Sequence, residues 1–105
     1  MTKVFDKNNF TGEVLESKGP VIVKFWAPGC HPCTMMNPVM EEAEQKYAGR
    51  ALIGQINIAE NMAVARKFNV MAVPTLILFK DGKALKENVG YIDFDEMDET
   101  FGELI

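Results

Sequence analysis

The sequence predicts an α/β protein with a central mixed β-sheet that is flanked by helices on both faces. Apolar segments typical of strands alternate three times with segments of helical periodicity, as in β-α-β units. After a further apolar strand over residues 75–80, Asp81-Gly82 indicates a tight hairpin, which adds an antiparallel strand before a last helix. The 105 residues, of which 48% are hydrophobic and 25% charged, are expected to form one domain, residues 1–105.

The first elements are expected in residues 2–20. Residues 2–6 alternate weakly between polar and apolar side chains and predict a short edge strand. A helix is expected to follow, capped by Asn8 or Asn9 and ending near Gly19-Pro20. Its inward-facing side chains are Phe10, Val14 and Leu15.

The β-branched and aromatic segment 21–27 predicts a buried central strand. A helix is expected over residues 32–47, bent at Pro38 because proline removes a backbone donor, and ended by Gly49. The apolar positions of this helix are Met35, Met36, Val39, Met40, Ala43 and Tyr47.

The second half of the chain predicts three strands and two helices. Strands are expected over residues 51–58, 75–80 and 84–90. A helix over residues 60–68 is expected to bury Met62, Ala65 and Phe68. The last helix begins near Asp93, a good N-cap, and its apolar residues are Phe94, Met97, Phe101 and Leu104.

The formal net charge is −4 without any basic run, so electrostatics do not support nucleic-acid binding. No apolar stretch approaches the roughly 20 residues of a membrane-spanning helix, so no membrane association is expected. The first residues lack the apolar core of a secretory signal, and a cytoplasmic location is expected. In that compartment two cysteines are more often catalytic or metal-binding than structural.

Both cysteines and the only histidine lie together in Cys30-His31-Pro32-Cys33, where the central strand ends and a helix begins. Cysteines three apart on a first helical turn share one face and can form a disulfide. The N–H groups and dipole of a helix N-terminus stabilise a thiolate, so Cys30 is expected to have a lowered pKa and to be nucleophilic. This context favours redox chemistry over two inert packing cysteines. A zinc or iron–sulfur site needs about four ligands and would require a dimer.

The segment Trp26-Ala27-Pro28-Gly29-Cys30-His31-Pro32-Cys33 resembles the active-site motif of the thioredoxin family. Further landmarks of that family recur in order over residues 3–104: Pro38, Val73-Pro74-Thr75, Phe79-Lys80-Asp81-Gly82 and Gly90. The resemblance implies the thioredoxin fold and the reduction of protein disulfides, with Cys30 as nucleophile and Cys33 as resolving cysteine. It implies no bound cofactor, no metal, protein disulfides as substrates and a thioredoxin-reductase-like electron donor. Nothing in the composition requires more than a monomer.

Lys24 is the main departure from the family pattern, because thioredoxins carry a buried aspartate there that is thought to accept the proton of the deeper cysteine. Gln55 stands where the family has that aspartate's lysine neighbour. Burial of an unpaired ammonium costs about 3 kcal/mol or more. Three interpretations stay open: a neutral Lys24 that acts as base for Cys33, a charged Lys24 that lowers the cysteine pKa values, and an inert Lys24 whose head reaches solvent.

The two residues between the cysteines are expected to tune them. His31 replaces the glycine usual in thioredoxins, and an imidazolium beside Cys30 would stabilise the thiolate and make the pair more oxidising. An exposed imidazole of little influence is the alternative. Pro32 fixes φ in the first helical turn without costing a hydrogen bond, which should limit how the pair rearranges on oxidation.

The substrate-binding surface is predicted from the resemblance, which implies a cis peptide bond before Pro74. In the family this loop faces the cysteines, and the backbone of the residue before proline pairs with an extended substrate segment. Gly29 stands where thioredoxins commonly have an aromatic residue. The binding candidates are Trp26, Gly29, Met71, Ala72, Val73, Pro74, Gly90 and Tyr91.

Two other functions stay open. Lys24, His31 and Gly29 together suggest a more oxidising disulfide oxidase or isomerase. The loss of the buried aspartate suggests a thioredoxin-fold binding module that does not turn over.

Overall fold

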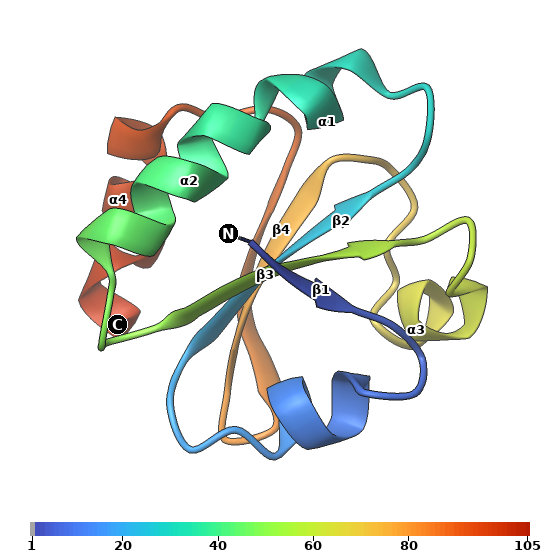
Figure 1. Cartoon of the computed structure of the whole chain (residues 1–105), viewed down its shortest axis with the longest axis horizontal. Helices are drawn as coiled ribbons and strands as arrows, with labels where there is room; N and C mark the ends of the chain where they lie inside the picture. Colours follow the sequence, from blue (N-terminus) through green and yellow to red (C-terminus); the bar gives the residue numbers. More distant parts are fainter. Residues whose placement is uncertain (1) are drawn as a thin grey trace.

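The computed structural model describes residues 2–105, whose strands form a five-stranded mixed sheet (Figure 1). The strands are β1 (Lys3–Phe5), β2 (Val21–Trp26), β3 (Leu52–Asn57), β4 (Thr75–Lys80) and β5 (Lys83–Val89). Their order is β1-β3-β2-β4-β5. Strand β3 runs parallel to β1 and β2, whereas β4 runs antiparallel to β2 and β5. The predicted mixed sheet, its edge strand β1 and its closing hairpin are confirmed.

Helices cover both faces of this sheet, as predicted (Figure 1). The helical segments are the π-helical turn η1 (Thr11–Leu15), α1 (His31–Met35), α2 (Asn37–Lys46), α3 (Met62–Lys67), α4 (Phe94–Phe101) and the 3₁₀ turn η2 (Gly102–Leu104). Side chains of α2 and α4 share one apolar core, and side chains of η1 and α3 share the other. The protein therefore has the thioredoxin fold that the sequence implied.

Strand β2 separates the two cores because its side chains alternate between the faces. Val21, Val23 and Phe25 pack in the core beneath η1 and α3, whereas Ile22 packs in the core beneath α2 and α4. The first core is built around aromatic rings. The ring of Phe10 lies 5.5 Å from that of Phe79, centroid to centroid, and contacts three further rings: Phe5, Phe25 and Phe68.

The first helix is shorter than predicted and capped differently. It ends at Leu15, because Ser17 then bonds with Gly19 and turns the chain towards β2. Asp6 accepts hydrogen bonds from the backbone N–H groups of Asn8 and Asn9, while Asn9 Oδ1 accepts from Asp6 N–H. The sequence interpretation of an asparagine cap was therefore wrong, since the aspartate two residues earlier closes this turn.

The helix predicted over residues 32–47 is broken at Met36 into α1 and α2, just before Pro38. The predicted interruption is thus confirmed. The buried stripe across both helices runs through Cys33, Met36, Val39, Met40, Ala43 and Tyr47. Met35, which helical spacing placed among the apolar positions of this helix, lies beside this stripe and is 46% exposed, so the expectation that it packs inward was wrong.

The prediction that Met62 is buried, which rested on helical periodicity, was also wrong. Met62 is 54% exposed, because α3 turns Val64, Ala65 and Phe68 towards the sheet, and Met62 lies off that stripe. The last helix, by contrast, begins as predicted. Asp93 accepts a hydrogen bond from the Glu96 N–H at 2.9 Å, and the Glu96 carboxylate in turn accepts one from the Asp93 N–H, forming a capping box.

Candidate active site

The Cys30–Cys33 disulfide lies at the junction of β2 and α1. Gly29, in the turn before it, adopts φ +80°, which favours glycine. Cys30 is the N-cap residue of α1, and its Sγ accepts a hydrogen bond from the Cys33 N–H at 3.2 Å. The two Cα atoms are 5.3 Å apart, within the range that a disulfide needs. The predicted strand–helix placement of both cysteines is confirmed.

The two cysteines differ in exposure. Cys33 is 2% exposed, whereas Cys30 is half-buried. His31 and Pro32 are both exposed, and Pro32 lies in the first turn, where its missing donor costs no intrahelical bond. An approaching molecule therefore meets Cys30 and His31 before Cys33.

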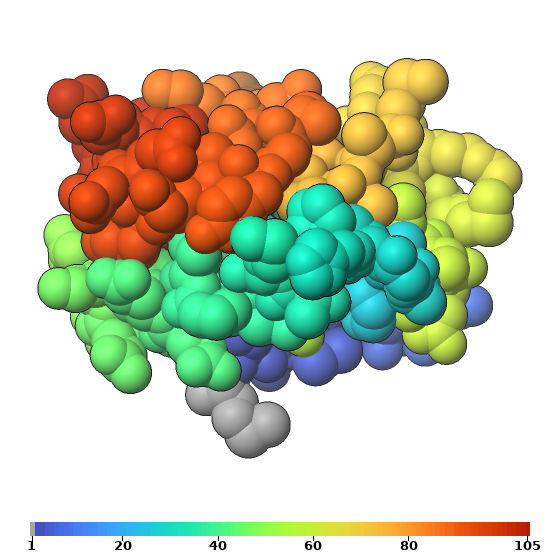
Figure 2. All heavy atoms as spheres, turned by 90° about the horizontal axis from the view of Figure 1, so that it is seen from above, coloured from blue at the N-terminus to red at the C-terminus, as the bar shows by residue number. Residues whose placement is uncertain are grey.

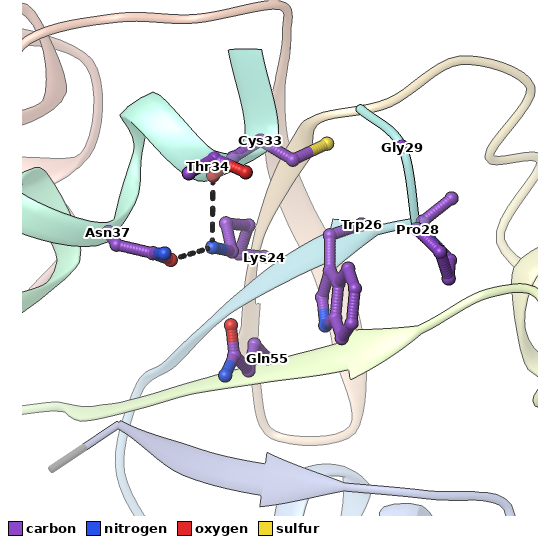
Figure 3. A pocket seen from close by; sticks show the side chains of 9 residues that line it. Lys24, Trp26, Pro28, Gly29, Cys33, Thr34, Asn37 and Gln55 are labelled. Atoms are coloured by element: carbon purple, nitrogen blue, oxygen red, sulfur yellow. Dashed lines mark hydrogen bonds between the residues drawn. The ribbon is translucent and has the colours of Figure 1, made fainter. Parts of the chain in front are cut away.

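Lys24 is buried beside the deeper cysteine, with 2% of its surface exposed. Its Nζ donates to the Asn37 Oδ1 at 2.7 Å and to the Cys33 carbonyl oxygen at 3.3 Å (Figure 3). Burial lowers the pKa of Lys24 below its ordinary value, because the charged amine loses hydration. The interpretation in which its head reaches solvent was therefore wrong. The other two interpretations, base and charged tuning group, remain.

A cavity of about 190 Å³ opens beside Lys24 (Figure 3). It is lined by Lys24, Trp26, Ala27, Pro28, Gly29, Cys33, Thr34, Asn37 and Gln55. Gln55 reaches it because β3 pairs with β2 at Lys24. Since one water occupies about 30 Å³ of liquid, this polar cavity is large enough for several waters.

The loop before β4 lies at the same end of the sheet. The Val73–Pro74 peptide bond is cis, as the resemblance implied. Thr75 is paired with Phe25, so the loop stands beside the carboxyl end of β2. Figure 2 shows the gold segment that leads into β4 directly beside the teal start of α1. Gly90, at φ +98°, donates from its N–H to the Pro74 carbonyl at 2.8 Å.

The remaining binding candidates differ in exposure. Met71 is 94% exposed, and Ala72, Tyr91 and Gly29 are exposed as well. Trp26 is half-buried and forms part of the cavity wall. The fold thus gathers Lys24, Trp26, Gly29 and Cys33 around one cavity, and it places the cis-proline loop next to them.

Two residues of this site were missed by the sequence analysis. Asn37 binds the Lys24 amine, and the Thr34 hydroxyl donates to the Cys30 carbonyl at 3.4 Å. A usable signal was present for Asn37, because it lies one helical turn after Cys33 and therefore on the same face. Nothing in the spacing distinguished Thr34 from an ordinary helix-surface residue.

A half-buried and a buried cysteine joined at a strand–helix junction, beside a cis-proline loop, define a dithiol–disulfide oxidoreductase. Within residues 2–105, no three His, Cys, Asp or Glu side chains group so that they could hold a metal ion. None of the helices in the described part of the chain has the length and apolar character needed to cross a bilayer.

Comparison with known proteins supports this class. The family model described as Thioredoxin matches residues 1–103. Thioredoxin 1 from Synechococcus elongatus is 43% identical over 83 residues, which cover 79% of this chain and 78% of the relative. The thioredoxin from Buchnera aphidicola is 35% identical over 107 residues, covering 100% of this chain and 99% of the relative.

The chain belongs to the thioredoxin family and is a thiol–disulfide oxidoreductase. A third relative, thioredoxin 1 from Nostoc sp., is 39% identical over 93 residues, which cover 89% of this chain and 87% of the relative. These similarities do not favour the more oxidising oxidase or isomerase, nor the non-catalytic binding module.

Proposed function

We propose that the protein reduces protein disulfides, with Cys30 as the nucleophile and Cys33 as the resolving cysteine. The unequal exposure of the two sulfur-bearing residues carries this proposal. The Cys30 thiolate attacks one substrate sulfur, and the other substrate sulfur leaves as a thiolate. The Cys33 thiolate then attacks Cys30 Sγ, and the second substrate sulfur leaves with its electron pair. Two electrons thus pass from the protein dithiol to the substrate.

The substrate segment is proposed to lie along the cis-proline loop. Among residues 2–105, no backbone hydrogen bond involves the N–H or C=O of Val73, so both are available to an extended chain. Trp26, Gly29, Met71 and Tyr91 offer apolar and aromatic contact around this backbone. Three further positions complete the proposed binding surface: Ala72, Pro74 and Gly90.

Three neighbours are proposed to tune the cysteine pair. Lys24 contacts the backbone of Cys33, so the protonation of its amine is linked to that of the thiol. His31 adjoins Cys30, where an imidazolium stabilises the thiolate. Pro32 restricts the backbone between the two sulfurs.

The wider setting follows from the family and the composition. We expect a cytoplasmic monomer that receives electrons from a thioredoxin-reductase-like donor and passes them to client proteins. The net charge of −4 and the lack of a basic run give a nucleic acid no attachment surface. No membrane partner is expected.

The experiment is the reduction of insulin disulfides by dithiothreitol, with and without the protein. Wild type is expected to accelerate it, and Cys30→Ser to return it to the uncatalysed rate. Cys33→Ser keeps the nucleophile but cannot resolve, so when it is first reduced, freed of dithiothreitol and then mixed with insulin, it is expected to accumulate a covalent mixed disulfide. Thr11→Ser, an exposed change on η1, serves as the matched control.

Catalysis by Cys30→Ser would contradict the assignment of the nucleophile. Failure of Cys33→Ser to trap any adduct, while Cys30→Ser traps one, would reverse the two roles. A wild-type rate equal to that of dithiothreitol alone would contradict the proposed function itself.

A further inference from the structure

The Lys24 amine donates hydrogen bonds to two oxygen atoms, and both belong to uncharged groups. One is the side-chain Oδ1 of Asn37 at 2.7 Å, and the other is the Cys33 carbonyl oxygen at 3.3 Å. Within residues 2–105 no carboxylate forms an ion pair with Lys24. An ammonium buried to this degree normally has a carboxylate partner, so these contacts suit the uncharged amine better.

The number of contacts agrees with this interpretation. A neutral amine has two N–H donors and one lone pair, whereas an ammonium has three donors. The two carbonyl oxygens match the two donors of the amine. The third direction at Nζ is then a lone pair, and Lys24 itself forms part of the wall of the cavity that Cys33 also lines.

The surroundings of Nζ contain few groups that could compete for a proton. Of the residues lining the cavity, Lys24 and Cys33 are the titratable ones. On the neighbouring strands Lys24 is paired with Gln55 and Leu76, which do not titrate. On α2, Glu41 lies one turn beyond Asn37 and is exposed to solvent.

We propose that Asn37 is a positioning residue for proton transfer from Cys33 to Lys24. Asn37 is exposed itself, yet its side chain closes over Nζ and fixes one N–H, while the Cys33 carbonyl fixes the other. This arrangement turns the lone pair towards the cavity, where water links it to the Cys33 thiol. The inference rests on the proposed function, because it concerns the resolving step.

The step is balanced within the protein and its substrate. The Cys33 thiol loses its proton through cavity water to Lys24 Nζ, which becomes an ammonium. The resulting thiolate attacks Cys30 Sγ, forming the Cys30–Cys33 bond and breaking the bond between Cys30 and the substrate sulfur. The substrate sulfur leaves as a thiolate, and the ammonium afterwards returns its proton to solvent.

The resolving step can be measured alone with oxidised glutathione as the probe. Reduced protein is mixed with the probe, quenched in acid, and analysed by mass for the glutathione adduct and the internal disulfide. The decay of the adduct is followed against pH for wild type, Asn37→Asp, Asn37→Ala and Lys24→Met. Glu41→Gln is the matched control, since it changes a charge one turn further along α2.

Opposite shifts are expected from the two Asn37 variants. The rate of adduct decay is expected to rise with pH as Lys24 loses its proton. A carboxylate at position 37 stabilises the ammonium, so in Asn37→Asp this rise should occur about one pH unit or more higher. At pH values below the wild-type rise, a shift of one pH unit corresponds to a slowing of about tenfold. Alanine removes the strongest hydrogen bond to the ammonium, so the rise should move to lower pH. In double variants that also carry Lys24→Met, neither Asn37 substitution should shift the pH at which the decay rate rises. Glu41→Gln should leave that pH unchanged.

Three results would overturn the inference while leaving the proposed function intact. The Asn37 variants could slow the step equally at every pH, which would mean a merely structural role. Asn37→Asp could cause the same shift in the Lys24→Met background, which would mean a direct effect on the thiol. Lys24→Met could leave the wild-type profile unchanged. If wild type instead forms no adduct or never resolves it, the proposed function fails.

Discussion

The two faces of strand β2 use neighbouring residues for different purposes. Val21, Val23 and Phe25 are fully buried in an apolar core of aromatic rings beneath η1 and α3. Ile22 and Lys24 point to the other face, where Ile22 enters the second core and Lys24 lines the cavity at Cys33. Alternate residues of this one strand thus contribute to an apolar core on one face of the sheet and to the cavity at Cys33 on the other face.

This difference shows where the fold tolerates an unfavourable group. The core cluster on the aromatic face is built of apolar side chains, so its stability follows mainly from buried apolar area. The opposite face buries an amine at a free-energy cost. We interpret that cost as the consequence of placing a proton-accepting group next to the resolving cysteine.

Truncation of the aromatic face should give the largest change in stability. Phe79 contacts Phe10 and Phe68 and lies at the end of β4 remote from Pro74. Phe79→Ala is expected to lower the free energy of unfolding by about 3–5 kcal/mol, because it leaves a cavity. Chemical denaturation measures this loss, and the rate of disulfide exchange per folded molecule should not change.

Phe79→Leu is the matched control, because it keeps most of the apolar volume and should lose less. A large loss of exchange rate in folded Phe79→Ala would contradict the separation of the two faces.

On the active face, removal of a side chain's polar group should stabilise the protein. Lys24→Met keeps the length of the side chain and removes the buried amine, so we expect a gain of about 1–3 kcal/mol at pH 7. Denaturation of both proteins in the oxidised state measures it. A less stable variant would show that the hydrogen bonds of Nζ outweigh its burial.

The same variant gives a pH dependence with a defined sign. The pKa of Lys24 is lowered in the folded protein from its ordinary 10.5, so between the folded value and 10.5 the unfolded chain binds more protons. The stability of wild type relative to Lys24→Met should therefore rise with pH across that window. A flat difference between the two proteins would contradict the lowered pKa.

The smallest effect is expected where the active face contacts the last helix. The Tyr47 hydroxyl donates to Asp98 Oδ1 at 2.6 Å, linking α2 to α4. Tyr47→Phe should cost about 0.5–1.5 kcal/mol. Tyr91→Phe, on an exposed ring, is the control and should cost nothing measurable.

This contact also has an alkaline limit. Burial and then Asp98 raise the pKa of Tyr47 above its ordinary 10.0. The stabilisation that the Tyr47 hydroxyl gives to the folded protein is therefore fully present below pH 10 and is lost as the pH rises further. Denaturation of wild type and Tyr47→Phe above pH 10 tests this, because only wild type should show the loss.

Most of the fold was predictable because its signals are local. The β-branched run of β2, the Asp81-Gly82 turn and the Asp93 cap each determine their own segment. The wrong predictions concern burial that depends on how a helix packs against its neighbouring elements. Met35 and Met62 have helical spacing, yet which stripe of each helix faces the sheet depends on the packing of the whole element.

The candidate site divides in the same way. The positions of Cys30, Cys33 and the cis-proline bond followed from the motif and the resemblance. The burial of Lys24 and the contact with Asn37 did not, because a lysine can extend either to solvent or into a cavity. A helix that closes over the strand decides between these outcomes, and sequence spacing does not contain that information.

The most direct test of the assignment as a reductant is the equilibrium redox potential of the Cys30–Cys33 pair, measured in dithiol and glutathione buffers. About 30 mV corresponds to a tenfold change in the equilibrium constant, so moderate precision is sufficient. We predict a value near about −270 mV, in the range of general thioredoxins. A value of about −200 mV or higher would contradict the assignment, since it would place the protein with disulfide isomerases and oxidases.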